Sequence, residues 1–307
     1  MVDAVPVSIG VSFPDSIVSG YPLPDIAGLA RVAEQAGLDG VWVADRLDAG
    51  DLPVLDSTLT LAAAAAVTSS IAVGYAAYVP SLRPLAWAAK QVATVQHIAG
   101  GRLQLGVVIG AGSDAEYAAA GFRRSDRARR TDEFLDLLPG LLTGQPRPYG
   151  SPGSGDAIPL PPTVPVPPLW IGGTSVPALR RVVRVGDGWL SGLQTPREFA
   201  ASRQRLFELS DEAGCGRPLT GIGLHAAIGT GSSLDLAEVT AATMHSMYGL
   251  PTDRAREIAI AGTPAQVASQ LAPYLAAGAD LIVVVCDPTP SAKSWELLAD
   301  ARLLLTR

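Results

Sequence analysis

The repeated order of short apolar runs and longer helical segments constrains the fold of this 307-residue chain most. Runs rich in Val, Ile and Leu alternate with segments whose apolar residues follow the period of a helix. Strands that are apolar on both faces are typical of a parallel sheet covered by helices on both sides. The sequence predicts strands at 5–11, 41–44, 71–78, 102–109, 169–171, 188–191, 221–228 and 281–285.

Helices are predicted between and after these strands. Eight strands alternating with helices predict a (β/α)8 TIM barrel. An open doubly wound sheet alternates in the same way, but no half of the chain resembles a separate nucleotide-binding domain. The helices are expected at 23–36, 56–69, 84–98, 127–142, 176–185, 196–213, 234–248, 264–277 and 294–305.

We expect one domain over residues 1–307. Within it, residues 144–168 are dense in Pro, Gly and Ser and carry no apolar period. Because the alternation resumes afterwards, this segment is predicted to be a variable loop or insertion before strand five rather than a domain linker.

Composition excludes several classes of partner. Hydrophobic residues make up 48% of the chain and charged residues 17%, with a formal net charge of −6. These values disfavour nucleic acid and acidic membranes as partners. The longest apolar runs, such as 59–67, are about half of the roughly 20 residues that span a bilayer. The start of the chain lacks the basic segment of a signal peptide, so a cytoplasmic protein is expected.

The two cysteines and three histidines form no recognisable metal or disulfide pattern. Cys215 and Cys286 lie far apart without a CxxC motif, which fits a reducing compartment. No H-E-x-x-H motif occurs, so we predict no catalytic metal. His225 lies in a predicted strand and could point into the barrel, although a lone core histidine is more often structural.

In a TIM barrel the site lies at the C-terminal ends of the strands. Glycine and small polar residues recur there, including Gly110 after strand four. Residues 172–175 (Gly-Gly-Thr-Ser) follow strand five and open a helix, where backbone N–H groups and two hydroxyls can bind a phosphate. An ordinary turn with a Thr or Ser cap explains the same pattern, and the spacing alone does not choose between them.

Charged residues also follow two of the strands. Asp45 and Arg46 come directly after strand two, and Glu116 follows strand four. Charges next to a buried strand are costly unless they are paired or solvated. A solvated loop pair is the plainer explanation for Asp45 and Arg46, and a functional pair is the alternative.

Several segments together resemble a known family. The chain resembles the luciferase-like monooxygenase superfamily, which includes FMN-dependent monooxygenases and oxidoreductases that depend on the deazaflavin coenzyme F-420. Each segment is weak alone, but they occur in family order from about residue 5 to 285. The matching segments are 33–45, 83–85, 90–91, 100–106, 116–117, 130–133, 170–173, 186–189, 262–267 and 277–280.

The resemblance implies a barrel with FMN or F-420 lying over the strand ends. It would place the cofactor phosphate near 172–174 and a non-proline cis peptide around 76–78, behind the ring. The cofactor-binding residues expected on this basis are Ala76, Ala77, Tyr78, Gly110, Gly172, Gly173, Thr174 and Ser175.

One departure from the family pattern affects the expected chemistry. Many relatives have histidine where this chain has Arg46. Arginine cannot exchange protons near neutral pH, although it can bind an anionic substrate or stabilise a reduced flavin. Asp114 and Glu116 become the alternative proton carriers, and with Asp45 and Arg46 they complete the catalytic candidates.

The resemblance supports three hypotheses. The first is an oxidoreductase, a monooxygenase that acts on a small organic substrate with reduced FMN, with a flavin reductase as a candidate partner. The second is hydride transfer with F-420, and the third is a non-catalytic flavin-barrel accessory protein. A homodimer is expected in each case.

An isomerase or aldolase barrel of another class is disfavoured. A Schiff-base enzyme of this kind needs a lysine on a strand. Lys90 and Lys293 both lie outside the predicted strands.

Overall fold

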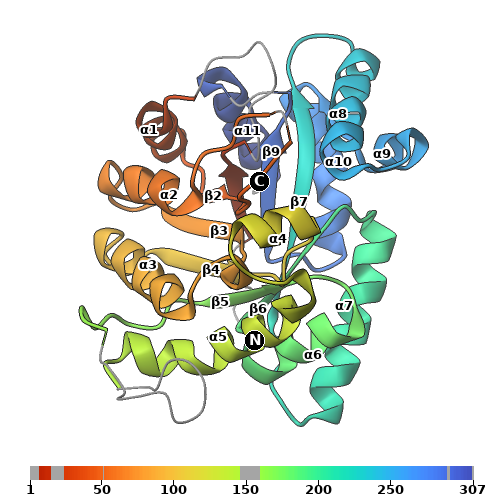
Figure 1. The fold of residues 1–307 in the computed structure, drawn as a ribbon. Coiled ribbons are helices and arrows are strands. Elements are labelled where there is room, and N and C mark those ends of the chain that lie inside the picture. Colours follow the sequence, from red (N-terminus) through yellow and green to blue (C-terminus); the bar gives the residue numbers. More distant parts are fainter. Residues whose placement is uncertain (1–6, 15–23, 51, 146–159, 289–290, 306–307) are drawn as a thin grey trace, which may run out of the picture.

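The computed structural model describes residues 7–14, 24–50, 52–145, 160–288 and 291–305. Parallel strands occupy the centre of the molecule and helices surround them (Figure 1). The strands are β1 (Ser8–Ser12), β2 (Gly40–Val43), β3 (Ala72–Tyr78), β4 (Leu103–Val107), β5 (Leu169–Gly172), β6 (Gly188–Gly192), β7 (Leu219–Ile228), β8 (Ile260–Gly262) and β9 (Leu281–Cys286).

The strands close into a barrel. Strands β1 to β7 pair in chain order, and β9 pairs with both β7 and β1. These eight strands therefore form a closed parallel ring, which confirms the predicted TIM barrel and excludes the open sheet. Strand β8 pairs only with the end of β7 and was not predicted, because three residues are too few to show a period.

The helices cover the outside of the barrel. The unpredicted helices α4 and α9 have six and seven residues, too few for an apolar period to be visible in sequence. The helices are α1 (Ile26–Ala36), α2 (Ser57–Ala66), α3 (Leu85–Ile98), α4 (Asp114–Ala119), α5 (Arg127–Leu142), α6 (Val176–Val185), α7 (Pro196–Glu212), α8 (Ser233–Tyr248), α9 (Thr252–Ile258), α10 (Pro264–Ala276) and α11 (Ala292–Leu305), with short 3-10 helices η1 (Pro80–Leu82) and η2 (Arg124–Asp126).

The segment before β5 is only partly described. Residues 146–159 of the predicted loop 144–168 lie outside the described residues, and 160–168 form neither helix nor strand. The backbone N–H of Val164 donates to the carbonyl of Leu142 at 2.9 Å, which ties this end of the loop to α5. The prediction of one domain over residues 1–307 stays a prediction. No helix in the described part of the chain is long and apolar enough to cross a bilayer.

Two tryptophans fill the interior of the barrel below the strand ends. Trp42 and Trp170 pack with apolar side chains of β6 and β9. A Cβ atom on Gly74 would lie 2.3 Å from Trp42, and one on Gly188 would lie 2.4 Å from Trp170, so these glycines make room for the rings. Open space therefore remains above this layer, at the C-terminal ends of the strands.

Candidate active site

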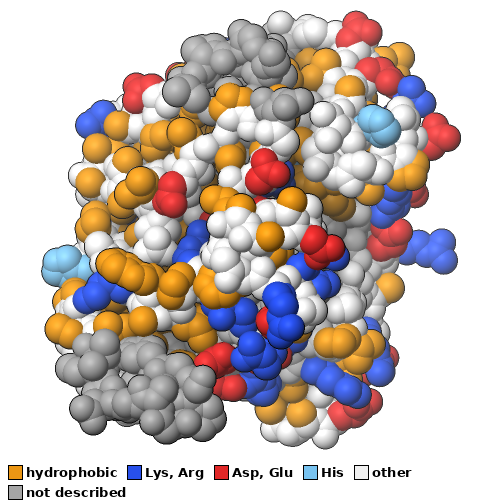
Figure 2. All heavy atoms as spheres, viewed as in Figure 1, with side chains coloured by type: hydrophobic (Ala, Val, Ile, Leu, Met, Phe, Trp, Pro, Cys, Tyr) orange, Lys and Arg blue, Asp and Glu red, His pale blue; other side chains and the backbone are white. Residues whose placement is uncertain are grey.

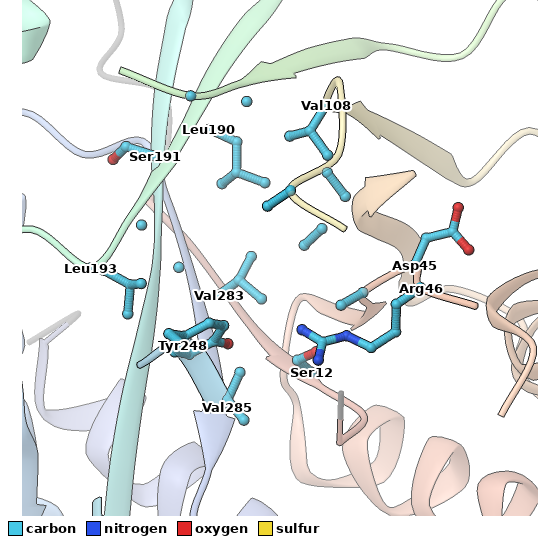
Figure 3. A pocket seen from close by; sticks show the side chains of 18 of the residues that line it. Ser12, Asp45, Arg46, Val108, Leu190, Ser191, Leu193, Tyr248, Val283 and Val285 are labelled. Carbon is cyan, nitrogen blue, oxygen red and sulfur yellow. The ribbon is translucent and has the colours of Figure 1, made fainter. Parts of the chain in front are cut away.

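A cavity of about 320 Å³ lies at the C-terminal ends of the barrel strands (Figure 3). This volume is within the usual range of roughly 300–1,000 Å³ for small-molecule sites. Much of its wall is backbone or methyl group, a surface against which a flat ring can lie closely. The small residues of the wall are Ala44, Ala76, Ala77, Gly110, Ala111, Gly172, Gly173, Gly192 and Gly223.

Most of the predicted cofactor residues line this cavity. The peptide bond between Ala76 and Ala77 is cis, as the family resemblance implies. Tyr78 does not line the cavity, because its side chain is buried and donates to Oε1 of Gln91 on α3 at 2.9 Å. The predicted site residues in the cavity wall are Asp45, Arg46, Ala76, Ala77, Gly110, Gly172 and Gly173.

Asp45 is anchored by four hydrogen bonds. Its Oδ1 accepts from Ser57 Oγ at 2.7 Å, and its Oδ2 accepts from the Val79 N–H at 2.8 Å. The Arg83 guanidinium donates to both oxygens, at 2.6 and 3.0 Å. Burial alone would lower the pKa of Arg83, but pairing with Asp45 outweighs it and raises that pKa. The prediction that Asp45 forms a solvated pair with Arg46 is therefore wrong, because Asp45 is buried and paired with Arg83.

Arg46 belongs to the cavity itself. It lines both this cavity and an adjoining one of about 590 Å³. In Figure 3 its guanidinium and the hydroxyl of Tyr248, at the end of α8, are directed toward each other from opposite walls. Arg46 thus brings a positive charge to the wall of the cavity.

The two acidic residues of α4 have different positions. Glu116 is buried, and its Oε1 accepts from the N–H groups of Leu47 and Asp48 at 2.8 and 3.2 Å. It therefore holds the loop that carries Arg46, and it lines the second cavity. Asp114 is exposed in the first turn of α4 and is absent from the walls of both cavities.

The turn after β5 contains an ordinary helix cap and a glycine in the left-handed region. Gly173 has φ +109°, and its carbonyl accepts from Trp189 Nε1 at 2.8 Å. Ser175 is the N-cap of α6, and its hydroxyl accepts from the Ala178 N–H at 3.4 Å. Thr174 is exposed. The cap that the sequence pattern also predicted is therefore present at Ser175.

Positive charge gathers beside this turn. Ser175 and Thr131 of α5 line a small cavity between α5 and α6, and Arg127 lies one turn before Thr131. Within the described ranges, Arg124 and Arg127 form no ion pair, and the buried Nε atom of each has no hydrogen-bond partner. Figure 2 shows Lys and Arg side chains collected on this face beside α4. Such a setting suits a phosphate at the N-terminus of α6.

A chain of three polar side chains reaches the opposite wall. His225 Nδ1 lies 3.1 Å from both carboxylate oxygens of Asp287, and Nε2 lies 3.0 Å from the Tyr248 hydroxyl. His225 and Asp287 are buried, and His225 and Tyr248 line the cavity. Sequence reasoning treated His225 as structural and missed Tyr248, because the three positions share no motif. The sequence held one weak signal for His225. Gly223 and His225 lie two residues apart in a strand, so both face the same side of β7.

No group of three or more His, Cys, Asp and Glu side chains in the described residues is placed to hold a metal ion.

Comparison with known proteins gives a family match. A family model described as luciferase-like monooxygenase matches residues 8–249. An uncharacterised protein of Mycobacterium tuberculosis is 31% identical over 169 residues, which are 53% of this chain and 56% of the relative. The match thus spans little more than half the length of this curated relative.

Solved structures share the fold at low sequence identity. An F-420-dependent secondary alcohol dehydrogenase in complex with an F-420–acetone adduct aligns with a TM-score of 0.79 and 16% identity, covering 98% of this chain and 99% of that one. EDTA monooxygenase from Chelativorans sp. BNC1 aligns with a TM-score of 0.77 and 19% identity, covering 98% and 94%.

Proposed function

The chain belongs to the luciferase-like monooxygenase family, whose members are oxidoreductases, and we propose that its cavity binds the ring of FMN or F-420 and exchanges two electrons with a small organic substrate. The main support is the cavity wall of glycine and alanine at the strand ends. The bound ring supplies the redox chemistry, while the protein positions it and tunes its charge.

The cavity offers room for a planar ring. A Cβ atom on Gly192 or Gly223 would meet no atom closer than 3.6 Å, so the wall is open at both positions. On the other side, the backbone of Ala76 and Ala77 forms the surface behind the proposed ring position.

The phosphate of the cofactor is proposed to lie at the start of α6. Thr174 carries a backbone N–H group at this helix end, and its hydroxyl is exposed, whereas the Gly173 N–H donates to the Leu190 carbonyl at 3.4 Å. Arg127 adds a positive charge that no carboxylate of the described residues neutralises. FMN and F-420 both carry a phosphate, so both fit this part of the site.

Two reactions follow from the two cofactors. With reduced FMN, the protein is a monooxygenase, and a flavin reductase is its proposed partner. With F-420, it transfers a hydride to or from the substrate. One observation favours F-420: its tail carries carboxylates beyond the phosphate, and within the described residues Arg124 and Arg127 form no ion pair, so their charges are available to such carboxylates.

Cofactor titration tests the proposal. Fluorescence titrations under anaerobic conditions with FMN, F-420 and riboflavin should give a Kd on the order of micromolar for one of the two phosphate-bearing cofactors. Riboflavin, which lacks the phosphate, should bind about tenfold more weakly. If neither FMN nor F-420 binds, the proposal is wrong. Binding without turnover of any substrate would favour the accessory protein instead.

A pair of variants tests the phosphate position. Arg127→Ala should weaken binding of the phosphate-bearing cofactor about tenfold, as expected for one lost charge-assisted hydrogen bond, and leave riboflavin unchanged. Arg129→Ala is the matched control, because Arg129 is exposed and pairs with Glu133 of the same helix. Equal losses for FMN and riboflavin would place the phosphate elsewhere.

We further propose that a second copy of this chain covers the outer face of α2 and α3. Leu59 on α2 and Trp87 on α3 are 72% and 66% exposed, which is unusual for large apolar side chains on neighbouring helices. A homodimer would remove both from water.

A further inference from the structure

Three side chains from three different elements meet at one wall of the cavity. His225 comes from the interior of β7, Asp287 directly follows β9, and Tyr248 ends α8. The parallel pairing of β7 with β9 places His225 opposite Val285, two residues before Asp287. The chain Asp287, His225, Tyr248 is therefore a product of barrel closure, and it ends at the cavity.

The hydrogen bonds in this chain have a preferred direction. Asp287 is an acceptor when ionised, so Nδ1 of His225 carries the proton that it donates to the carboxylate. In the neutral ring, Nε2 is then an acceptor, and the Tyr248 hydroxyl donates to it. This is the arrangement in which a carboxylate orients a histidine and stabilises its protonated form.

The tyrosine end of the chain is the part most exposed to the cavities. Asp287 and His225 are 8% and 4% exposed, whereas Tyr248 is half-buried and lines both cavities. Arg46 extends from the opposite wall toward the Tyr248 hydroxyl (Figure 3). A substrate oxygen between them would contact a proton carrier on one side and a fixed positive charge on the other.

We propose that Tyr248 is a catalytic acid–base residue and that His225 and Asp287 are positioning residues that act through it. The substrate in this proposal is an alcohol, phenol or enol, or the corresponding carbonyl compound. This rests on the proposed function for the role of the cavity as the substrate site. In the forward step the substrate O–H bond breaks and its proton passes to the Tyr248 oxygen, while the Tyr248 proton passes to Nε2 of His225. The products are a substrate oxyanion facing Arg46 and an imidazolium paired with Asp287, and the reverse step returns the proton from His225 through Tyr248 to the substrate oxyanion, which becomes a hydroxyl.

The other titratable groups around this chain do not replace it. Among the residues that the structure describes, the ionisable side chains in the wall of the cavity are Asp45, Arg46, His225 and Tyr248, and Asp45 is already paired with Arg83. Cys286 precedes Asp287, and burial together with the Asp287 charge raises its pKa to about 12, so it stays a thiol near neutral pH. Glu116 lines only the adjoining cavity, where the loop backbone holds it.

A chromogenic phenol tests the relay without knowledge of the natural substrate. 4-Nitrophenol absorbs visible light as the phenolate, and it is added to the full chain at a pH about one unit below the pKa that the probe has in water. In the wild type, binding should generate phenolate. In Tyr248→Phe, which removes only the hydroxyl, the ratio of bound phenolate to phenol should fall about tenfold, one pKa unit. His97→Gln, on the exposed side of α3, is the matched control for His225→Gln, which should behave like Tyr248→Phe.

Nitrogen-15 NMR of the wild type gives a second readout that a merely structural role would not produce. His225 should change from one protonated ring nitrogen to two when the probe binds, and His97 should not change. Unchanged His225 signals, equal phenolate in Tyr248→Phe and wild type, or no phenolate in the wild type would each overturn the relay. The same samples are titrated with FMN and F-420. If the cofactor binds but the probe is not ionised, the relay is wrong and the proposed function stands. If the probe is ionised through Tyr248 but neither cofactor binds, the proposed function is wrong and the relay stands.

Discussion

Replacing Asp45 by alanine should destabilise the protein strongly, although sequence reasoning placed this residue among the catalytic candidates. The Asp45 side chain is 2% exposed and that of Arg83 is 17% exposed. Alanine would leave the guanidinium, the Val79 N–H and the Ser57 hydroxyl without their acceptor. Removal of one partner of a buried ion pair costs about 3–5 kcal/mol of unfolding free energy.

Urea unfolding monitored by circular dichroism measures this loss. The midpoint should fall in Asp45→Ala at an unchanged slope. Asp48→Ala is the control, because Asp48 is exposed and the one described hydrogen bond of its side chain is accepted from the Gly50 N–H, while its backbone bond to Glu116 is kept in the variant. Its effect should stay within about 0.5 kcal/mol.

A double variant separates the ion pair from other effects. Because the cost comes from the uncompensated Arg83 charge, Asp45→Leu combined with Arg83→Met should lose less than the sum of the two single changes. The reasoning is refuted if Asp45→Ala loses under about 1 kcal/mol, or if the single losses simply add.

Three further predictions concern stability, the cavity and assembly. Burial raises the pKa of Glu34, but hydrogen bonds from backbone N–H groups outweigh it and lower this pKa to about 2. The ionised Glu34 therefore stabilises the fold fully above about pH 4.5, and this contribution is lost as the pH falls toward 2. Glu34→Gln should flatten the dependence of the urea midpoint on pH in this window. Gly223→Leu should abolish cofactor binding while the thermal midpoint stays within a few degrees, since its Cβ points into open space; tight binding in this variant would place the ring elsewhere. Trp87→Glu should convert a dimer to a monomer in light scattering, and an unchanged mass would exclude the α2–α3 face.

The strand ends near the cavity could be predicted because they depend on local patterns. Apolar runs and helical periods identify the elements, and parallel strands in a barrel gather their C-terminal ends at one face. Arg46, Ala76, Gly110 and Gly173 were placed at that face on this basis, and they line the cavity. The short elements α4 and α9 escaped prediction because six or seven residues span fewer than two helical turns, too few to establish a repeating pattern.

The roles of the polar residues could not be predicted in the same way. Asp45 and Arg83 are 38 residues apart, and His225 and Asp287 are 62 residues apart. No spacing rule links such positions, since their distance depends on which strands pair and in which register. Glu116 likewise contacts the loop after β2 only because α4 folds back over the strand ends.

The sequence by itself therefore predicted the (β/α)8 barrel, the face that carries the site and some of the small residues that line it, because the strands and the residues at their ends follow from the local period of apolar and polar side chains. Tertiary structure alone decided that Asp45 anchors Arg83 and that Tyr248, His225 and Asp287 meet. Hydrogen bonds between distant residues form only after barrel closure removes those groups from water, where an unpaired polar group is costly and each must find a partner.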